Sequence, residues 1–143
     1  MTAATQIDPD KVRAYLATGY RIGHTSQDIV LTIGQRSERL ASFFATNGVD
    51  CGAFLTAYNP QGTVQTDTAN ERAHAELAAK LHALGLHAIE GSGSEEGTDW
   101  PSEKSYFALG LALEPAKEIG THFDQDAIVC VGAEAVPQLI LLR

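Results

Sequence analysis

Basic residues are scarce in this chain of 143 residues, which contains ten Lys and Arg against eighteen Asp and Glu and has a formal net charge of −8. Proteins that bind nucleic acids take much of their affinity from clustered Lys and Arg side chains at the phosphates. The charge balance therefore argues against a nucleic-acid partner. It still permits a small anionic ligand held by one or two arginines.

Long apolar segments are also missing. The longest apolar runs, such as Ala127–Val131 and Leu139–Leu142, are far shorter than the roughly 20 residues of a membrane-spanning helix. The segment 1–10 contains neither the basic nor the apolar region of a secretory signal. We therefore expect a cytoplasmic protein without a membrane partner.

Cysteine is rare, since Cys51 and Cys130 are the only thiols. Each lies among small or apolar neighbours in a predicted strand, and a cytosolic protein normally keeps its thiols reduced. We interpret both as packing residues. A catalytic cysteine would instead require a histidine nearby in the fold.

Motifs for catalysis and cofactor binding are absent from the sequence as well. It contains no Gly-x-Ser-x-Gly, Walker or His-Glu-x-x-His motif, so nucleophilic or metal-hydrolase chemistry has no motif support. The glycine-rich stretch Gly91–Asp99, predicted as a loop, carries acidic residues that would repel a phosphate and lacks the spacing of a calcium loop. The histidines are too scattered to predict a metal site. We expect neither a metal nor a cofactor.

Hydrophobic periodicity and end signals predict the order of the secondary-structure elements. Helices are predicted at 9–18, 37–47, 67–84 and 114–122. Strands are predicted at 20–22, 28–33, 51–57, 86–90, 103–111, 127–131 and 138–142. Ser37 is the expected cap of the second helix, and Asp67 or Thr68 that of the third. The first two strands are expected to form an antiparallel hairpin.

The elements from Cys51 to Val131 follow the order strand, helix, strand, strand, helix, strand. Two split βαβ units in this arrangement predict a ferredoxin-like βαββαβ core over about 51–131. An N-terminal helix, hairpin and helix and an extra C-terminal strand would complete a single α+β domain over 1–143. A different α+β sheet with the same element order is the alternative, because the sequence does not fix the order of the strands.

Polar residues gather where the core strands and the long helix begin or end, and these are the candidate ligand-binding residues. They are Thr56, Tyr58, Asn59, Asn70, Arg72, Ser105 and Gln125, and Glu103, at the start of a core strand, is the candidate catalytic residue. One loop joins the first core strand to the long helix, so Asn59 and Asn70 are expected to be close. The second core strand is expected to run antiparallel to the first, which leaves the position of Glu103 dependent on strand register. Taken singly, each residue could instead serve a turn, a helix cap or a surface ion pair.

The same residues carry a resemblance to a known family. The ordered combination of Phe54-x-Thr56-Ala57-x-Asn59-Pro60, Asn70, Leu84-Gly-Leu86, Trp100-Pro-x-Glu103-x-Ser105 and Phe123-x-Gln125-x-Ala127 resembles the small bacterial proteins labelled DUF3293. The likeness extends over about 20–143. It implies no established activity, and it would assign family positions to Thr56, Asn59, Pro60, Asn70, Glu103, Ser105 and Gln125. Tyr58 departs from the tryptophan or small residue that the family pattern leads us to expect there.

Three functional hypotheses remain open. The first is a binding or regulatory module that holds a small polar ligand or a protein partner at the Thr56–Asn59 turn. The second is a small enzyme with Glu103 as the general base and with Asn59, Asn70 and Arg72 positioning the substrate. The third is a protein-interaction or inhibitor domain, in which the apolar strand Gln138–Leu142 forms the edge of a homodimer or the acidic surface meets a basic partner.

Overall fold

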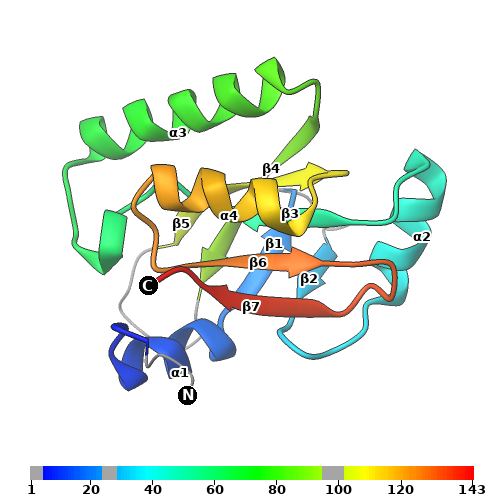
Figure 1. The fold of residues 1–143 in the computed structure, drawn as a ribbon, viewed down its shortest axis with the longest axis horizontal. Helices are drawn as coiled ribbons and strands as arrows, with labels where there is room; N and C mark the ends of the chain where they lie inside the picture. The colour runs from blue at the N-terminus through cyan, green and yellow to red at the C-terminus, as the bar shows by residue number, and fades with distance from the viewer. Residues whose placement is uncertain (1–4, 24–28, 95–101) are drawn as a thin grey trace.

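The computed structural model describes residues 5–23, 29–94 and 102–143. The helices are α1 (Pro9–Ala17), α2 (Glu38–Asn47), α3 (Asp67–Ala83) and α4 (Leu113–His122), with the short 3-10 helix η1 (Pro60–Gly62). The strands are β1 (Gly19–Ile22), β2 (Ile29–Leu31), β3 (Gly52–Leu55), β4 (His87–Ser94), β5 (Glu103–Leu109), β6 (Ala127–Val131) and β7 (Pro137–Leu141). Figure 1 shows α3 and α4 on one side of the strands and α1 on the other. None of the helices built from described residues is long and apolar enough to cross a membrane.

The strands form one seven-stranded sheet in the order β2-β1-β4-β5-β3-β6-β7, and all neighbouring pairs are antiparallel. The expected α+β class is confirmed, as is the hairpin of β1 and β2. The expectation that the first two core strands, β3 and β4, run antiparallel is wrong. Both are antiparallel to β5, so they run parallel to each other. A helical crossover such as α3 allows two strands of one sheet to run in the same direction.

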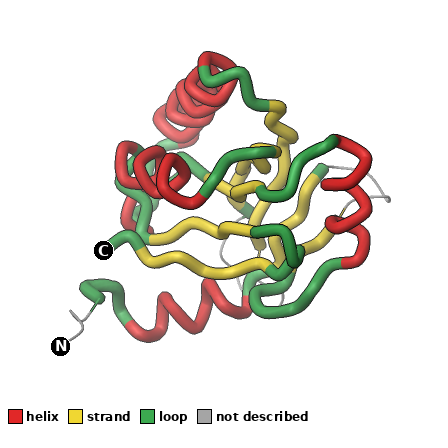
Figure 2. Tube along the Cα trace, turned by 45° about the vertical axis from the view of Figure 1, so that its right-hand side comes forward, coloured by secondary structure: helices red, strands yellow, loops and turns green. Residues whose placement is uncertain are grey.

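Side chains that alternate along the strands form a core on each face of the sheet. On one face, Phe54 of β3 and Phe107 of β5 pack with Phe44 of α2. Leu55, the neighbour of Phe54, points to the other face and joins side chains of α3 and α4. In Figure 2, α3 and α4 lie above the sheet and α1 lies below it. Full burial of an apolar side chain contributes roughly 1.5–3 kcal/mol, so both faces stabilise the sheet.

The helix starts follow from local hydrogen bonding. The predicted cap of α2 is confirmed, because the Ser37 hydroxyl accepts a hydrogen bond from a backbone N–H of the first turn. At the start of α3, the Thr66 hydroxyl accepts a 3.1 Å hydrogen bond from Ala69 N. The cap predicted at Asp67 or Thr68 is therefore wrong. Thr66 supplies the same kind of side-chain oxygen earlier in the chain, from an extended backbone conformation.

The stretch predicted as a loop from Gly91 onward begins as a strand. Residues 91–94 complete β4 and pair with β1, whereas residues 95–99 of the predicted loop lie outside the described residues. Gly91 lies opposite Ile22, and a Cβ atom at Gly91 would be 2.1 Å from the carbonyl oxygen of Arg21. Only glycine permits this close approach, so Gly91 marks a strand pairing and not a turn.

Candidate functional site

A pocket of about 320 Å³ lies between α1 and the sheet, and we call it the α1 pocket. One face of α1 closes it, because Lys11, Ala14, Tyr15 and Thr18 recur at helical spacing. Apolar or aromatic side chains of the sheet form much of its floor. They come from Tyr20 of β1, Phe54 of β3, Val129 of β6 and Leu139 of β7. None of the described residues of α1 is fully buried, so polar contacts contribute much of the attachment of the helix.

The polar wall of the α1 pocket contains most of the residues predicted from the sequence. It includes Thr56, Asn59, Glu103, Ser105 and Gln125. Asn70 lies behind Asn59 as its hydrogen-bond partner. Tyr58 packs toward α3, and Arg72 is exposed on α3. The fold thus brings together residues as far apart in the sequence as Thr56 and Gln125. Tyr58 and Arg72 are not among the residues that line the pocket.

Strand register places Glu103 beside Asn59. β3 and β5 are antiparallel neighbours with Leu55 opposite Tyr106. The last residues of β3 and the first residues of β5 therefore lie side by side at one end of these strands. The side-chain amide of Asn59 donates a 2.8 Å hydrogen bond to Oε2 of Glu103. The position of Glu103, which the sequence leaves dependent on register, is therefore in the site.

Two buried asparagines hold the turn after β3 in place. Asn59 has a φ of 44°, a left-handed conformation that Asn adopts more readily than most residues. Its backbone N–H donates to Oδ1 of Asn70, and the Asn70 side-chain amide donates to Oδ1 of Asn59, both at 2.9 Å. Gln65 adds one donor to each of these two oxygens. Asn70 is therefore a positioning residue that fixes how Asn59 presents its amide to Glu103.

The other wall residues also hold the backbone in place. The Thr56 hydroxyl donates a 2.8 Å hydrogen bond to a main-chain carbonyl oxygen of β5. The side-chain amide of Gln125 donates to the carbonyl oxygen of Tyr58 at 3.1 Å. The buried Ser105 hydroxyl donates to the carbonyl oxygen of Glu103 at 3.3 Å. These contacts fix the wall before a ligand arrives, which lowers the entropic cost of binding.

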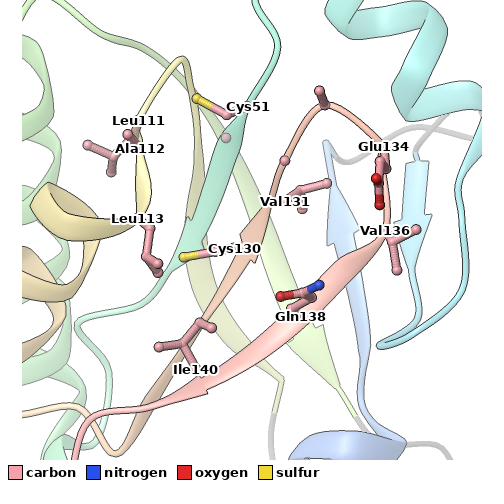
Figure 3. Close-up of a pocket in the computed structure, with 13 residues that line it drawn as sticks. Cys51, Leu111, Ala112, Leu113, Cys130, Val131, Glu134, Val136, Gln138 and Ile140 are labelled. Atoms are coloured by element: carbon pink, nitrogen blue, oxygen red, sulfur yellow. The ribbon is translucent and has the colours of Figure 1, made fainter.

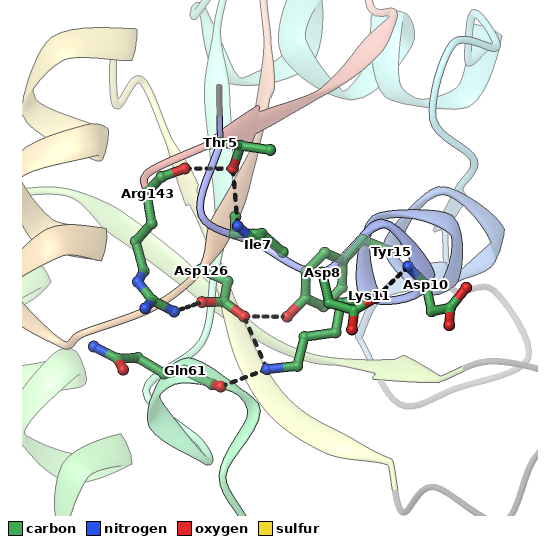
Figure 4. Close-up of polar contacts among 9 residues, drawn as sticks. All are labelled: Thr5, Ile7, Asp8, Asp10, Lys11, Tyr15, Gln61, Asp126 and Arg143. Atoms are coloured by element: carbon green, nitrogen blue, oxygen red, sulfur yellow. Dashed lines mark hydrogen bonds and ion pairs between the residues drawn. The ribbon is translucent and has the colours of Figure 1, made fainter. Parts of the chain in front are cut away.

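A carboxylate that the sequence does not single out connects α1 to the rest of the fold, as Figure 4 shows. Asp126 is 3% exposed, and it accepts a 2.8 Å hydrogen bond from the Tyr15 hydroxyl. Arg143 donates to the other oxygen of Asp126 at 2.6 Å, and the Lys11 ammonium lies 3.7 Å from the carboxylate. These partners offset the cost of burying the charge of Asp126.

Lys11 also connects α1 to η1. Its ammonium group donates a 2.9 Å hydrogen bond to the carbonyl oxygen of Gln61. Lys11 and Tyr15 are four residues apart in the sequence, so both approach Asp126 from the same face of α1. The sequence signal for this arrangement is an acidic residue directly before an apolar strand. That signal is too common to predict a buried contact with a helix more than a hundred residues away.

Burial and negative charge keep the tyrosines of the α1 pocket protonated. The pKa of Tyr15 is raised by burial first, then by its hydrogen bond to Asp126 and by the charges of Asp126 and Glu103. Burial is also the first cause that raises the pKa of Tyr20, and the charge of Glu103 adds to it. Both hydroxyls are therefore donors at neutral pH, and Tyr20 donates to the carbonyl oxygen of Tyr15 at 2.6 Å. The effect on both tyrosines means that the charge of Glu103 acts on the interior of the pocket.

Tyr58 belongs to a separate polar cluster beneath α3. Its hydroxyl donates to Glu71, and Glu71 pairs with Lys104 at 2.8 Å. The ring of the buried His74 stacks on Tyr106 with the ring centroids 4.4 Å apart, and it meets Tyr58 edge to face. Burial, followed by the hydrogen bond to Glu71, raises the pKa of Tyr58. These contacts account for Tyr58 by packing and pairing, and a ligand-binding role for it stays a prediction.

A second pocket, of about 390 Å³, lies at the opposite end of β3, and we call it the cysteine pocket (Figure 3). Cys51 and Cys130 line it together with apolar side chains that include Leu113 and Ile140. Both thiols are free, and burial raises the pKa of each, for Cys130 to about 11. A protonated thiol is a poor nucleophile and a poor metal ligand. Among the residues that the structure describes, no three His, Cys, Asp or Glu side chains gather as a metal site.

One known family matches the central part of the chain. The sequence model of the family described as "Protein of unknown function (DUF3293)" matches residues 55–128. This segment contains the whole polar wall of the α1 pocket, whereas α1 itself precedes it. Trp100 and Pro101, which take part in the resemblance, lie outside the described residues. No curated protein and no solved structure matches the chain.

Proposed function

The chain belongs to the DUF3293 family, whose function is unknown, and we propose that it is a binding module that holds a small molecule in the α1 pocket. The observation that carries this proposal is the convergence of Asn59, Glu103 and the other polar wall residues on one pocket with an apolar floor. The polar end of the ligand would meet Glu103 and Asn59. Its body would lie on Phe54 and Val129.

The size and the chemistry of the α1 pocket support a small ligand. Ligand pockets usually measure roughly 300–1,000 Å³ and combine an apolar lining with a few fixed polar groups. The α1 pocket, at about 320 Å³, is at the lower end of this range. It therefore suits a small metabolite better than a peptide or a dinucleotide.

Two matched variants of α1 test binding in this pocket. Ala14 lines the pocket, whereas Ala17 is exposed on the same helix. The new ring would fill the pocket in Ala14→Phe and would lie in solvent in Ala17→Phe. A thermal-shift screen of small metabolites should find compounds that stabilise the native protein and Ala17→Phe but not Ala14→Phe. Equal stabilisation of all three proteins would contradict binding in the α1 pocket, and a screen without stabilising compounds would argue against a binding function.

A small enzyme with Glu103 as general base is the second candidate. It is favoured by the position of the Glu103 carboxylate in the pocket wall, where it can reach a proton of a bound substrate. The positioning role proposed for Arg72 has less support, because Arg72 is exposed on α3, and Asn70 would act only through Asn59.

Mass spectrometry of a bound compound after incubation separates these two functions. A binding module leaves the mass of the compound unchanged. An enzyme of the proposed kind converts the compound, and its Glu103→Gln variant binds the compound without converting it. Conversion at the same rate by Glu103→Gln would remove Glu103 from the role of general base.

A protein partner at the edge of the sheet is the third candidate. β7 is an outer strand, and its described residues Pro137–Leu141 carry no charged side chain. Charged side chains on an edge strand discourage pairing with another chain, so β7 lacks this protection. A homodimer formed through β7 would give a mass near twice that of the chain in light scattering. A monomer at all concentrations would contradict it.

We also propose that β3, α3, β4, β5, α4 and β6 form a ferredoxin-like unit. The order β4-β5-β3-β6 and the antiparallel pairs support this proposal, and a solved structure with a different strand order would contradict it. A cytoplasmic location is proposed because a reducing compartment preserves free thiols such as Cys51 and Cys130. Recovery of the protein in a secreted fraction would contradict that location.

A further inference from the structure

The floor of the α1 pocket is almost out of contact with water. Phe54 and Val129 line the pocket, yet only 4% and 2% of their surfaces are exposed. α1 lines the pocket from the other side with Ala14 and Tyr15, and Figure 2 shows this helix below the sheet. A small molecule that comes to rest on Phe54 and Val129 therefore has to displace part of the cover that α1 provides.

Apolar packing holds α1 only weakly against the sheet. None of its described residues is fully buried, and the side chain of Leu16 is among the exposed large apolar ones. Polar contacts reach the rest of the fold from Tyr15, which donates to Asp126, and from Lys11, which donates to the carbonyl oxygen of Gln61. Elements with few buried apolar contacts are the ones that open locally at the lowest free energy. We therefore expect α1 to detach before the sheet unfolds.

One carboxylate receives both side chains of α1, and it stays paired without them (Figure 4). The Tyr15 hydroxyl and the Lys11 ammonium lie 2.8 and 3.7 Å from Oδ2 of Asp126, and we call these two contacts the latch. Arg143, which is not part of α1, donates to Oδ1 at 2.6 Å. Loss of a partner is costly when it leaves a buried charge uncompensated. Because Asp126 keeps Arg143 when α1 moves away, the latch can open and form again.

Both ends of α1 are anchored, so the helix can lift without leaving the fold. After its last turn, Thr18 has an extended backbone, and Gly19 begins β1, which pairs with β2 and β4. Before its first turn, the Thr5 hydroxyl donates to the carbonyl oxygen of Arg143, and Ile7 is buried. Short connections between fixed ends keep α1 near the sheet after each opening, which favours closure.

We propose that α1 is the lid of the α1 pocket. It opens at the latch to admit and release a small molecule, and it closes when the Tyr15 hydroxyl returns to Asp126. This inference rests on the binding function proposed above and adds the control of access to it. Lids of this kind shield a bound molecule from water, and they belong to the less stable parts of a fold. The strength of the latch then sets how often the pocket opens.

The rate at which a thiol in the pocket reacts with iodoacetamide measures the opening of the lid. Val129→Cys places this thiol on the floor of the pocket, in a chain whose own two thiols are removed by Cys51→Ala and Cys130→Ala. Tyr15→Phe takes only a hydroxyl from the latch. Because hydrogen bonds to charged groups are strong, its loss should make the thiol react roughly thirtyfold faster.

Tyr58→Phe is the matched control. It also removes a tyrosine hydroxyl that donates to a carboxylate, but the acceptor is Glu71 of α3. The reaction rate of the thiol in Val129→Cys should therefore not change in this variant.

A thiol on the other face of the sheet separates opening of the lid from unfolding of the whole chain. Leu77→Cys places it in the core beneath α3, where it should react far more slowly and its rate should rise steeply with urea. The rate in Val129→Cys should depend little on urea at low concentration, because lifting one helix exposes little new surface. Ser105→Cys, a nearly isosteric change at another buried pocket residue, should behave like Val129→Cys and supplies the test if Val129→Cys does not fold.

Three results would overturn the lid. An unchanged rate in Tyr15→Phe would remove the latch. Equal rates and equal urea dependence in Val129→Cys and Leu77→Cys would mean that the pocket opens only when the whole chain unfolds. A rate in Val129→Cys as high as in the urea-unfolded chain would mean that α1 does not cover the floor. These measurements use no ligand, so a thermal-shift screen without stabilising compounds would contradict the binding function and leave the lid standing.

Discussion

Removal of the Asp126 carboxylate should loosen α1 over the pocket. In the Asp126→Ala variant, the Tyr15 hydroxyl loses its charged acceptor and the Lys11 ammonium loses its ion-pair partner. Figure 4 shows how these side chains of α1 meet Asp126. Because none of the described residues of α1 is fully buried, apolar packing compensates little for the loss. The variant therefore tests whether the buried Asp126 carboxylate holds α1 in place over the α1 pocket.

The size of the effect follows from the exposure of the partners. A hydrogen bond to a charged acceptor contributes about 1.5–3 kcal/mol. The side chain of Lys11 is 43% exposed, so water screens its ion pair, which adds less than about 1 kcal/mol. We expect the attachment of α1 to weaken by about 2 kcal/mol. This corresponds to roughly thirtyfold faster exchange of its amide hydrogens when α1 exchanges through local opening.

Hydrogen exchange followed by mass spectrometry measures this attachment. Peptides covering Pro9–Ala17 should exchange roughly thirtyfold faster in Asp126→Ala than in the native protein, while peptides from α3 should change much less. The Glu76→Ala variant removes an exposed carboxylate from α3 and is the matched control. Equal protection of α1 in Asp126→Ala and in the native protein would refute the reasoning, because contacts other than Asp126 would then hold the helix.

Three further predictions concern the stability of the folded chain. Asn70→Ala should lower the free energy of unfolding in urea by about 2–4 kcal/mol, because the backbone N–H of Asn59 loses its buried acceptor. A loss below about 1 kcal/mol would contradict the role of Asn70 in holding the turn after β3. Gly91→Ala should lower it by more than about 2 kcal/mol, since the new Cβ would lie 2.1 Å from the Arg21 carbonyl oxygen, and unchanged stability would argue against the close pairing of β1 and β4. All four tyrosines have raised pKa values in the folded chain, with burial as the first cause. Folding therefore favours their protonated forms, and this stabilisation is complete below the unfolded pKa of about 10 and is lost as the pH rises through the folded values. Phenolate absorbance should accordingly appear at higher pH in the native protein than in urea, and coincident titration curves would be evidence against buried hydroxyls.

Local signals predict the elements well, and they fail where the partner of a residue is distant in the sequence. The strand Ala127–Val131 has the bounds that its apolar run predicts, and Ser37 caps α2 as expected. The loop predicted from Gly91 onward is wrong at this residue, because a glycine also occurs in a strand where a second strand approaches it closely. That second strand is β1, whose pairing with β4 no local pattern indicates.

The candidate site is predictable to the extent that single connections determine it. Asn59 and Asn70 are joined by one short loop, so their contact follows from the sequence. Glu103 requires the register of β3 and β5, which only the folded sheet provides. Tyr58 lies next to Asn59 in the chain, yet its side chain packs toward α3, because the chain bends at these two residues and Asn59 has a left-handed backbone conformation. Asp126 is missed because its partners on α1 meet it only in the fold.

A crystal structure of the protein soaked with a compound that stabilises it in the thermal-shift screen tests most directly whether the α1 pocket holds a small ligand. We expect density for the compound in the α1 pocket, with its body on Phe54 and Val129 and its polar end roughly 3 Å from the side chain of Glu103 or Asn59. Density for the compound in the cysteine pocket, with none in the α1 pocket, would contradict the proposed binding function.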